Sequence, residues 1–490
     1  MQDTSKEKSK YSITPGEYAA NVRKEDGYSD ISEAIEYGDI DAVKLFIKEG
    51  ADIHALSVIA LAKSHNGKML QFLIEQGADI FQEEEGLGRG IMHYVVHSYG
   101  SDIDSYKNGD KPNREWDRFS SEQDIHNKYL GIIKVLAGHG YDVNKPVLSH
   151  STPLQLAMCI RVVPELAFYL VEECGADVNC AGVYDIEEKY KEYTDDAKKY
   201  RYEPVSIDEF KECRPFSPLE IASQMRPGEV SFEICKLLVR HGADVNYISL
   251  DYDEDGPDEL SPLCAAIELE NIPVVQLLIE NGADVNLTMR GVVDESDERS
   301  PLLMALHEGS IPIIKLLLEN GADVNYAGVY DIEKKYKEYT NDAEIHGYDP
   351  VSIDEFKKCR PSSPLMRACC WDPGEESFEV CKLFVRHGAD VNYISLDYWP
   401  DEWSPLCYAI GNIPVMQLLI ENGADVNLTM RCNEDFNGAD ERSPLLVALQ
   451  EENIPSIKLL LENGAEITDS IREYVDECDF DDEIRELFGM

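Results

Sequence analysis

The stretch "SPLCAAIELENIPVVQLLIENGADVN" at residues 261–286 contains one complete structural unit. Ser261 suits the N-cap of a helix, and Pro262 fits the first helical position, where no N–H is needed. Pro273 suits the start of a second helix, and Gly282 supplies the left-handed residue at which that helix ends. Neither helix can bury its apolar face alone. The stretch therefore predicts a unit that is stable only when it stacks on similar units.

The same ending recurs along the chain, which indicates a repeat array. Ten segments share it: "FIKEGADIHA" (46–55), "LIEQGADIFQ" (73–82), "LAGHGYDVNK" (136–145), "VEECGADVNC" (171–180), "LVRHGADVNY" (238–247), "LIENGADVNL" (278–287), "LLENGADVNY" (317–326), "FVRHGADVNY" (384–393), "LIENGADVNL" (419–428) and "LLENGAEITD" (461–470). From the fourth unit on, each opens with Ser/Thr-Pro-Leu, at Thr152, Ser217, Ser261, Ser300, Ser363, Ser404 and Ser443. We therefore expect short helix pairs stacked in chain order.

This repeat resembles the ankyrin-repeat family, whose unit is a turn plus two antiparallel helices with a T-P-L-H-x-A signature. The resemblance covers roughly residues 30–468 and implies an all-α ankyrin-repeat solenoid of about ten helix-turn-helix repeats. The signature histidine is kept only at His93. Elsewhere its place is taken by Gln155, Glu220, Cys264, Leu303, Met366, Cys407 and Leu446. We therefore expect the hydrogen bonds of that histidine to be absent from most of the array.

Two connectors, 180–216 and 326–362, are much longer than the family unit allows, and they match each other. "VYDIEEKYKEY" (183–193) recurs as "VYDIEKKYKEY" (329–339), with Glu188 replaced by Lys334. The repeats that follow the connectors match as well, so the chain contains a tandem duplication. A recent copy looks alike without any selection for function, so the repetition alone is no evidence of a binding motif.

These patterns predict five parts. Residues 1–29 form a flexible N-terminal segment or partial cap. Residues 30–179 hold repeats 1–4, with an insertion at 101–124. Residues 180–325 are the first copy of the duplicated block (an insert plus repeats 5–7), and 326–468 are the second copy (an insert plus repeats 8–10). Residues 469–490 form an acidic C-terminal cap, or alternatively a lure for a basic partner.

Each long connector is predicted to form a helical hairpin. Ile186, Tyr190, Tyr193 and Ala197 fall on one helical face, and Ser206 opens a capping box before a second short helix. Tyrosine is common at protein interfaces because it is large, stiff and amphipathic. The candidate partner-binding residues are therefore Tyr184, Tyr190, Tyr193, Tyr202, Tyr330, Tyr336, Tyr339 and Tyr348. The alternative is that this tyrosine stripe only docks the hairpin onto its own solenoid.

The chain is strongly acidic, with 45 Lys and Arg against 95 Asp and Glu and a formal net charge of −50. Such a surface repels nucleic-acid phosphates and anionic membranes and favours a basic protein partner. We expect a monomer with no direct nucleic-acid binding and no membrane association, although the acidity could serve solubility alone. The sequence has neither a signal peptide nor a long apolar run. Its 13 scattered cysteines fit reduced thiols, so we expect a cytoplasmic protein.

Catalytic and metal motifs are weak. "DYDEDG" (251–256) starts like a calcium loop, but Pro262 stands where the bidentate glutamate belongs. His93 and His97 could pair with Asp102 on a metal, yet His93 fits a core helix better. The adjacent Cys369 and Cys370 have no cysteine counterpart in the first copy, which makes a redox role improbable. We predict no enzyme activity, no catalytic residue, no metal site and no cofactor.

The sequence therefore predicts a non-catalytic scaffold for protein–protein interaction. It would bind a basic partner through the concave face of the solenoid and the inserted connectors. The alternative is an acidic mimic of nucleic acid that inhibits a nucleic-acid-binding enzyme. A mimic needs carboxylates in rows on one surface, whereas acidity for solubility is spread around the molecule.

Overall fold

The computed structural model describes residues 30–490 apart from 65, 84–89, 109–120, 147–150, 160–162, 184, 201–203, 253–256, 294–295, 330–331, 347–351, 399–400, 432–440, 479, 481 and 490. The chain divides into two compact units, Met1–Leu250 and Asp251–Met490. This division falls inside the first copy of the predicted duplication, so the domain boundaries inferred from the sequence stay predictions. Each unit is described below by itself.

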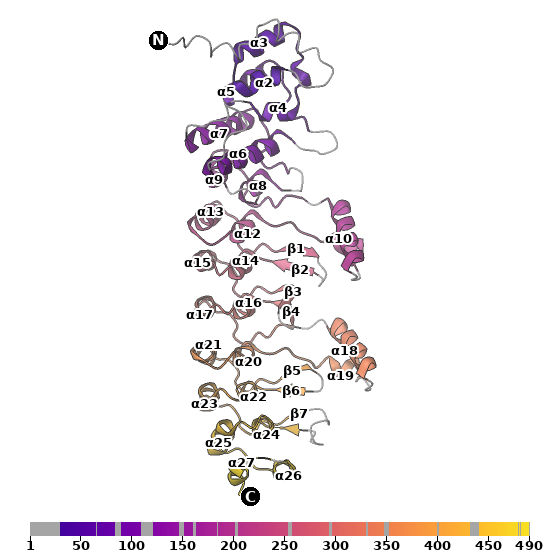
Figure 1. The fold of residues 1–490 in the computed structure, drawn as a ribbon, viewed down its shortest axis with the longest axis vertical. Coiled ribbons are helices and arrows are strands. Elements are labelled where there is room, and N and C mark those ends of the chain that lie inside the picture. Colours follow the sequence, from indigo (N-terminus) through magenta and orange to yellow (C-terminus); the bar gives the residue numbers. More distant parts are fainter. Residues whose placement is uncertain are drawn as a thin grey trace, which may run out of the picture. The chain divides into compact units, whose positions relative to one another are not determined.

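The first unit is built from helices that follow one another in pairs, coloured indigo to magenta in Figure 1. They are α2 (Asp30–Tyr37), α3 (Ile40–Lys48), a 3₁₀ turn (Ile53–Ala55), α4 (Val58–Ala62), α5 (Gly67–Glu75), α6 (Ile91–Lys107), α7 (Glu122–Gly138), α8 (Pro153–Cys159), α9 (Pro164–Glu172), α10 (Ile186–Tyr200), α11 (Ile207–Phe210), α12 (Pro218–Ser223) and α13 (Glu229–Arg240). The chain leaves this unit within strand β1 (Ser249–Tyr252).

The second unit continues the pattern and adds short strands (Figure 1). Its helices are α14 (Pro262–Glu268), α15 (Ile272–Glu280), α16 (Pro301–His307), α17 (Ile311–Glu319), α18 (Ile332–His346), α19 (Ile353–Phe356), α20 (Pro364–Cys369), α21 (Glu375–Arg386), α22 (Pro405–Tyr408), α23 (Ile413–Glu421), α24 (Pro444–Gln450), α25 (Ile454–Glu462), α26 (Asp469–Glu477) and α27 (Asp482–Leu487). Its strands are β2 (Pro257–Leu260), β3 (Met289–Val293), β4 (Ser296–Arg299), β5 (Ser395–Tyr398), β6 (Asp401–Trp403), β7 (Met430–Arg431) and β8 (Glu441–Arg442).

The helix starts follow the predicted chemistry. Ser261 is the N-cap of α14, with Pro262 at its first position and the Ser261 hydroxyl accepting from the Cys264 N–H at 3.3 Å. The same cap begins α12, α16, α20, α22 and α24. Gly282 has a φ of 91°, as a left-handed helix end requires. The predicted fold is therefore correct as a mostly helical repeat fold, while the count of ten repeats stays a prediction.

The strands are a feature that an all-α prediction omits. They pair two by two as antiparallel hairpins, β1–β2, β3–β4, β5–β6 and β7–β8, which we call the fingers. The β3–β4 finger places Met289 opposite Arg299, and β7–β8 places Met430 opposite Arg442. Met289 and Met430 are fully buried, so each of these two fingers places a methionine in the core.

Successive repeats are linked by the asparagine of the shared GADVN ending. Asn286 donates from Nδ2 to the Gly321 carbonyl at 3.0 Å, and its Oδ1 accepts from the Asp323 N–H at 2.7 Å. The same two bonds are made in the second unit by Asn325, Asn392 and Asn427, and in the first unit by Asn179. We call this series the asparagine ladder. It satisfies exposed backbone groups between neighbouring turns.

The insertion predicted at 101–124 is only partly a connector. Its first residues continue α6 to Lys107, and its last residues begin α7 at Glu122, while 109–120 lie outside the described residues. The lengthened pair is held by Tyr99, whose ring stacks on Tyr129 with centroids 4.9 Å apart. The Tyr99 hydroxyl also lies 2.5 Å from His126 Nδ1. Both ends of the predicted insertion are therefore helical and lengthen α6 and α7.

Candidate functional site: the inserted hairpins and the fingers

The first insert is a helical hairpin with its own small core. Tyr190 and Tyr193 on α10 both contact Phe210 on α11, with ring centroids 5.2 and 5.1 Å apart. Phe210 is fully buried and Tyr193 is 7% exposed. The Tyr190 hydroxyl donates to the Val205 carbonyl at 3.0 Å, and the Tyr193 hydroxyl accepts from the Val205 N–H at 3.3 Å. These rings and hydroxyls hold the hairpin together.

The second insert is built in the same way. Tyr336 and Tyr339 on α18 contact Phe356 on α19, with centroids 5.3 and 5.1 Å apart. Phe356 forms a buried cluster with Cys359 and with Leu396 of β5. The hairpin core is therefore continuous with the finger that follows it. Tyr193 and Ala197 of the predicted face are buried in the first copy, and Ile332, Tyr336 and Tyr339 pack against the Phe356 cluster in the second.

Each insert is tied to the next finger by backbone hydrogen bonds. In the first unit, Arg214 and Leu250 exchange two N–H···O bonds of 2.9 and 3.0 Å, and the Tyr247 hydroxyl donates to the Pro215 carbonyl at 2.8 Å. In the second unit, the Leu396 N–H donates to the Arg360 carbonyl at 2.9 Å, and Tyr393 reaches Pro361 at 3.0 Å. Figure 1 shows α10 set to one side of α12 and α13, and α18 to one side of α20 and α21. Each insert is thus anchored to the finger that follows it and lies beside the helix pairs.

The predicted partner-binding tyrosines divide into two groups. Tyr190, Tyr193, Tyr336 and Tyr339 pack inward as described, so their contact with a partner stays a prediction. The other four, Tyr184, Tyr202, Tyr330 and Tyr348, lie outside the described residues.

The apolar side chains that the inserts expose are different ones. Val183 and Val329, which hold the same place in the two copies, are 57% and 45% exposed. Tyr200 and Ile345, near the ends of α10 and α18, are 57% and 76% exposed. Tyr200 continues the stripe of Tyr193 and Ala197, so periodicity alone places it inside. Its exposure is therefore a finding that helical periodicity does not predict.

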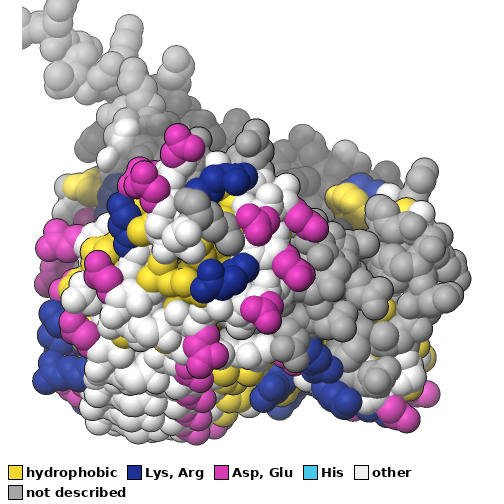
Figure 2. Space-filling view, turned by 90° about the horizontal axis from the view of Figure 1, so that it is seen from below, with side chains coloured by type: hydrophobic (Ala, Val, Ile, Leu, Met, Phe, Trp, Pro, Cys, Tyr) yellow, Lys and Arg dark blue, Asp and Glu magenta, His cyan; other side chains and the backbone are white. Residues whose placement is uncertain are grey.

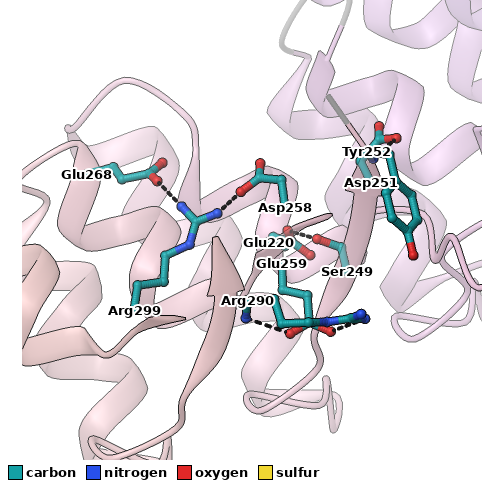
Figure 3. Close-up of polar contacts among 9 residues, drawn as sticks. All are labelled: Glu220, Ser249, Asp251, Tyr252, Asp258, Glu259, Glu268, Arg290 and Arg299. Atoms are coloured by element: carbon teal, nitrogen blue, oxygen red, sulfur yellow. Dashed lines mark hydrogen bonds and ion pairs between the residues drawn. The ribbon is translucent and has the colours of Figure 1, made fainter. Parts of the chain in front are cut away.

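The fingers of the second unit are joined by carboxylate–arginine clamps, of which Figure 3 shows the one between Glu259 and Arg290. Glu259 of β2 accepts from the Arg290 N–H at 2.8 Å and from its guanidinium at 3.1 Å. Glu402 of β6 makes the corresponding contacts to Arg431, at 2.9 Å from N–H and 2.9 Å from Nε. Both glutamates are mostly buried. The clamp is thus a feature common to both copies of the block.

A buried arginine lies beside the first clamp. The Arg299 guanidinium contacts Asp258, and its Nη1 lies 3.8 Å from a Glu268 carboxylate oxygen (Figure 3). Its counterpart Arg442 lies over the Trp403 ring, 4.4 Å from the centroid. Burial, and then Glu308, raise the pKa of Glu268 despite the nearby guanidinium.

The residues at two signature positions form hydrogen bonds that the sequence pattern does not predict. The Gln155 amide donates to the carbonyls of Ala181 and Phe216 at 3.1 and 2.7 Å, so it bridges the two ends of the first insert. Glu220 is fully buried, accepting from the Ser217 N–H at 3.3 Å and from the Ser249 hydroxyl at 2.5 Å. Gln155 and Glu220 thus form hydrogen bonds at positions where the signature histidine is absent. The polar side chain at each position is the sequence feature that could have indicated this.

The candidate metal residues do not converge. His93 and His97 have ring centroids 6.5 Å apart, whereas Asp102 accepts from the Tyr129 hydroxyl at 2.5 Å and faces Lys128. Within the described ranges, no group of three His, Cys, Asp or Glu side chains could hold a metal ion. Residues 253–256 of the calcium-like loop lie outside them. Among the described helices, none is both long and apolar enough to cross a membrane.

Comparison with known families gives one match. A family model of ankyrin repeats matches in three copies, over residues 219–327, 343–430 and 365–471. These matches run from α12 to α25, but residues 328–342 fall between them, so only the last residues of the insert helix α18 are covered. No curated protein matches the chain.

Proposed function

The chain is an ankyrin-repeat protein, and from this premise we propose that it is a non-catalytic scaffold that binds a basic protein partner. Ankyrin repeats generally mediate protein–protein interaction. Binding would use the concave face of the array and the inserted hairpins. The observation that carries this proposal is the docking of both inserts, which fixes exposed apolar side chains at the same place in each copy of the block.

Several contacts support the inserts as binding elements. A segment held by its own core and by backbone bonds loses little entropy when a partner arrives. Val183 and Val329 lie at the entrance of each hairpin and are exposed, although burying a valine in contact with protein is favourable. The whole chain has a formal net charge of −50, so a basic partner surface gains both apolar contact and attraction.

The distribution of charge favours a scaffold over a mimic of nucleic acid. In the view from below, Figure 2 shows Asp and Glu side chains at several places around the visible face, interspersed with Lys and Arg. A mimic requires an uninterrupted row of carboxylates, because phosphates follow one another without cations between them. Interspersed charge supports solubility and selective contact with a basic protein.

The test introduces a positive charge at each insert. A partner is first isolated with the full chain from cells that produce it, purified, and its Kd measured. Changing Val183→Lys and Val329→Lys together should weaken binding about tenfold or more, because apolar contacts are lost and a cation faces the basic surface. Val230→Lys is the matched control, since Val230 is 45% exposed on α13, away from the insert.

Equal loss in both variants, or no loss in either, would reject the inserts as the binding surface. A partner that is a nucleic-acid enzyme, is displaced by duplex DNA and is unaffected by the insert changes would favour the mimic instead. Added salt should strongly lower the affinity in both cases, because a scaffold and a mimic would each bind a basic surface.

A further inference from the structure

Two buried cysteines meet between the helices of one repeat in the second unit. Cys369 is the last residue of α20, and Cys381 lies in α21. Their Sγ atoms are 3.9 Å apart, which is van der Waals contact for sulfur, and the side chains are 3% and 0% exposed. Cys370, the next residue, is exposed and donates to the Met366 carbonyl.

The first copy of the block shows what this pair replaces. There Ser223 faces Cys235, with Oγ and Sγ 4.0 Å apart, and the Ser223 hydroxyl donates to the Leu219 carbonyl at 2.8 Å. Gln224 follows Ser223, so this repeat has one thiol where the second copy has three. The backbone therefore accepts either residue at this contact, and the second copy places a second sulfur within reach of the first.

We propose that Cys369 and Cys381 are a covalent-modification site, which a small disulfide such as oxidised glutathione converts to an intrachain disulfide. A disulfide needs the two sulfurs about 2.0 Å apart. From 3.9 Å, this is a closing movement of about 2 Å, within what side-chain rotation and a small helix shift provide. The product would fasten α20 to α21 in the repeat that follows the second insert.

The chemistry proceeds by two exchanges. The thiolate of one cysteine attacks the small disulfide, forming a mixed disulfide and releasing one small thiol. The thiolate of the other cysteine then attacks the protein sulfur of that mixed disulfide, forming the Cys369–Cys381 bond and releasing the second small thiol. Two protein thiols lose two protons and two electrons, and one small disulfide becomes two small thiols.

Reaction must be slow in the closed repeat. The hydrogen bond with Cys381 and then burial raise the pKa of the Cys369 thiol, so little of the nucleophilic thiolate exists at neutral pH. A small disulfide also reaches the pair only when the end of α20 opens locally. The expected rate therefore rises with pH and with mild denaturant, while an exposed thiol reacts at once.

The test treats the reduced full chain with oxidised glutathione and follows it by mass spectrometry. Trypsin cuts after Arg367 and Lys382, which places all three cysteines on one peptide, 368–382. Cross-linking appears as the loss of two hydrogens, whereas glutathionylation of Cys370 alone appears as an added glutathionyl group. Further cleavage at Glu375, Glu376 and Glu379 leaves two pieces joined only if Cys381 is bonded.

Three variants decide the outcome. Cys370→Ser should keep the cross-link, and Cys369→Ser, which recreates the contact of the first copy, should abolish it while the chain stays folded. Ser223→Cys should create a second cross-link with Cys235. Persistence of the cross-link in Cys369→Ser would overturn the proposal. So would a wild-type chain that carries only glutathionylated Cys370 after its α20–α21 repeat has been allowed to open in mild denaturant.

Discussion

The two inserts have nearly the same sequence and the same internal core, yet the repeats that flank them hold them differently. The first lies between Gln155, whose amide bridges both of its ends, and Glu220, whose buried carboxylate holds Ser249. At the matching signature positions, the second has Leu303 and Met366. Ser395, the counterpart of Ser249, is fully buried, and its hydroxyl has no hydrogen-bond partner among the described atoms.

This difference shows that one fold accepts two kinds of anchor. The hairpin cores and the finger contacts are kept in both copies, so they are sufficient to position an insert. The polar anchors of the first insert add directional bonds, and their loss in the second leaves packing alone at those positions. Four sets of substitutions test these anchors and the core beside them.

The largest effect is expected at Glu220. Glu220→Ala removes the acceptor for Ser217 and Ser249 and leaves a cavity, which should cost about 3 kcal/mol of unfolding free energy. Glu220→Met should cost only about 1–2 kcal/mol, because methionine fills the space as Met366 does in the other copy. Denaturant unfolding followed by circular dichroism measures both. Equal losses would mean that hydrogen bonding, rather than volume, explains the site.

The next effect is expected at Gln155. Gln155→Leu gives the first insert the residue that precedes the second, and it leaves the Ala181 and Phe216 carbonyls without their donor. We expect a loss of about 1–2 kcal/mol and faster amide hydrogen exchange in α10 and α11. Leu303→Met serves as the control and should leave exchange in α18 unchanged. Unchanged exchange in α10 would show that Gln155 does not hold the insert.

Smaller effects on the free energy of unfolding, of opposite sign, are expected at Ser249 and Ser395. Ser249→Ala should cost about 1 kcal/mol, because the Glu220 carboxylate loses a donor in a buried site. Ser395→Ala should be neutral or stabilising by up to about 1 kcal/mol, since it removes a buried hydroxyl that has no partner among the described atoms. Thermal unfolding of the two single variants makes the comparison. Similar losses in both would contradict it.

The smallest effect appears only in alkali. Burial raises the pKa of the Cys235 thiol to about 12, whereas an unfolded thiol ionises near pH 8.5. The unfolded state therefore loses its proton first, so this thiol's contribution to stability is full below about pH 8.5 and falls as pH rises towards 12. Cys235→Ala should flatten the decline in unfolding free energy between pH 8 and 10. An unchanged slope would assign the decline to other groups.

Much of the fold follows from local rules that the sequence displays. Ser261 and Pro262 define a helix start whatever lies around them, and Gly282 marks a helix end because its φ is positive. Periodicity also places Tyr190 and Tyr193 on one helical face, and in the structure both rings contact Phe210. In each case, the structure depends on neighbours in sequence.

The features that were missed depend on partners far away in the chain. The fingers are strands of two to five residues, which are too short for a periodic pattern to predict. The clamps between fingers join residues far apart in the chain, such as Glu402 and Arg431. The role of Gln155 likewise depends on carbonyls at both ends of an insert. The exposure of Tyr200 is likewise not predicted by the helical periodicity of α10.

The asparagine ladder gives the array a chemical direction. Every ladder asparagine uses its side chain on the repeat that follows it and never on the one before, as Asn392 does with Gly423 and Asp425. Cutting the array therefore produces two unlike ends. An end exposed by removing later repeats carries an idle side-chain amide, which water solvates easily. An end exposed by removing earlier repeats carries a bare backbone N–H and carbonyl, which is the chemistry that attracts another chain.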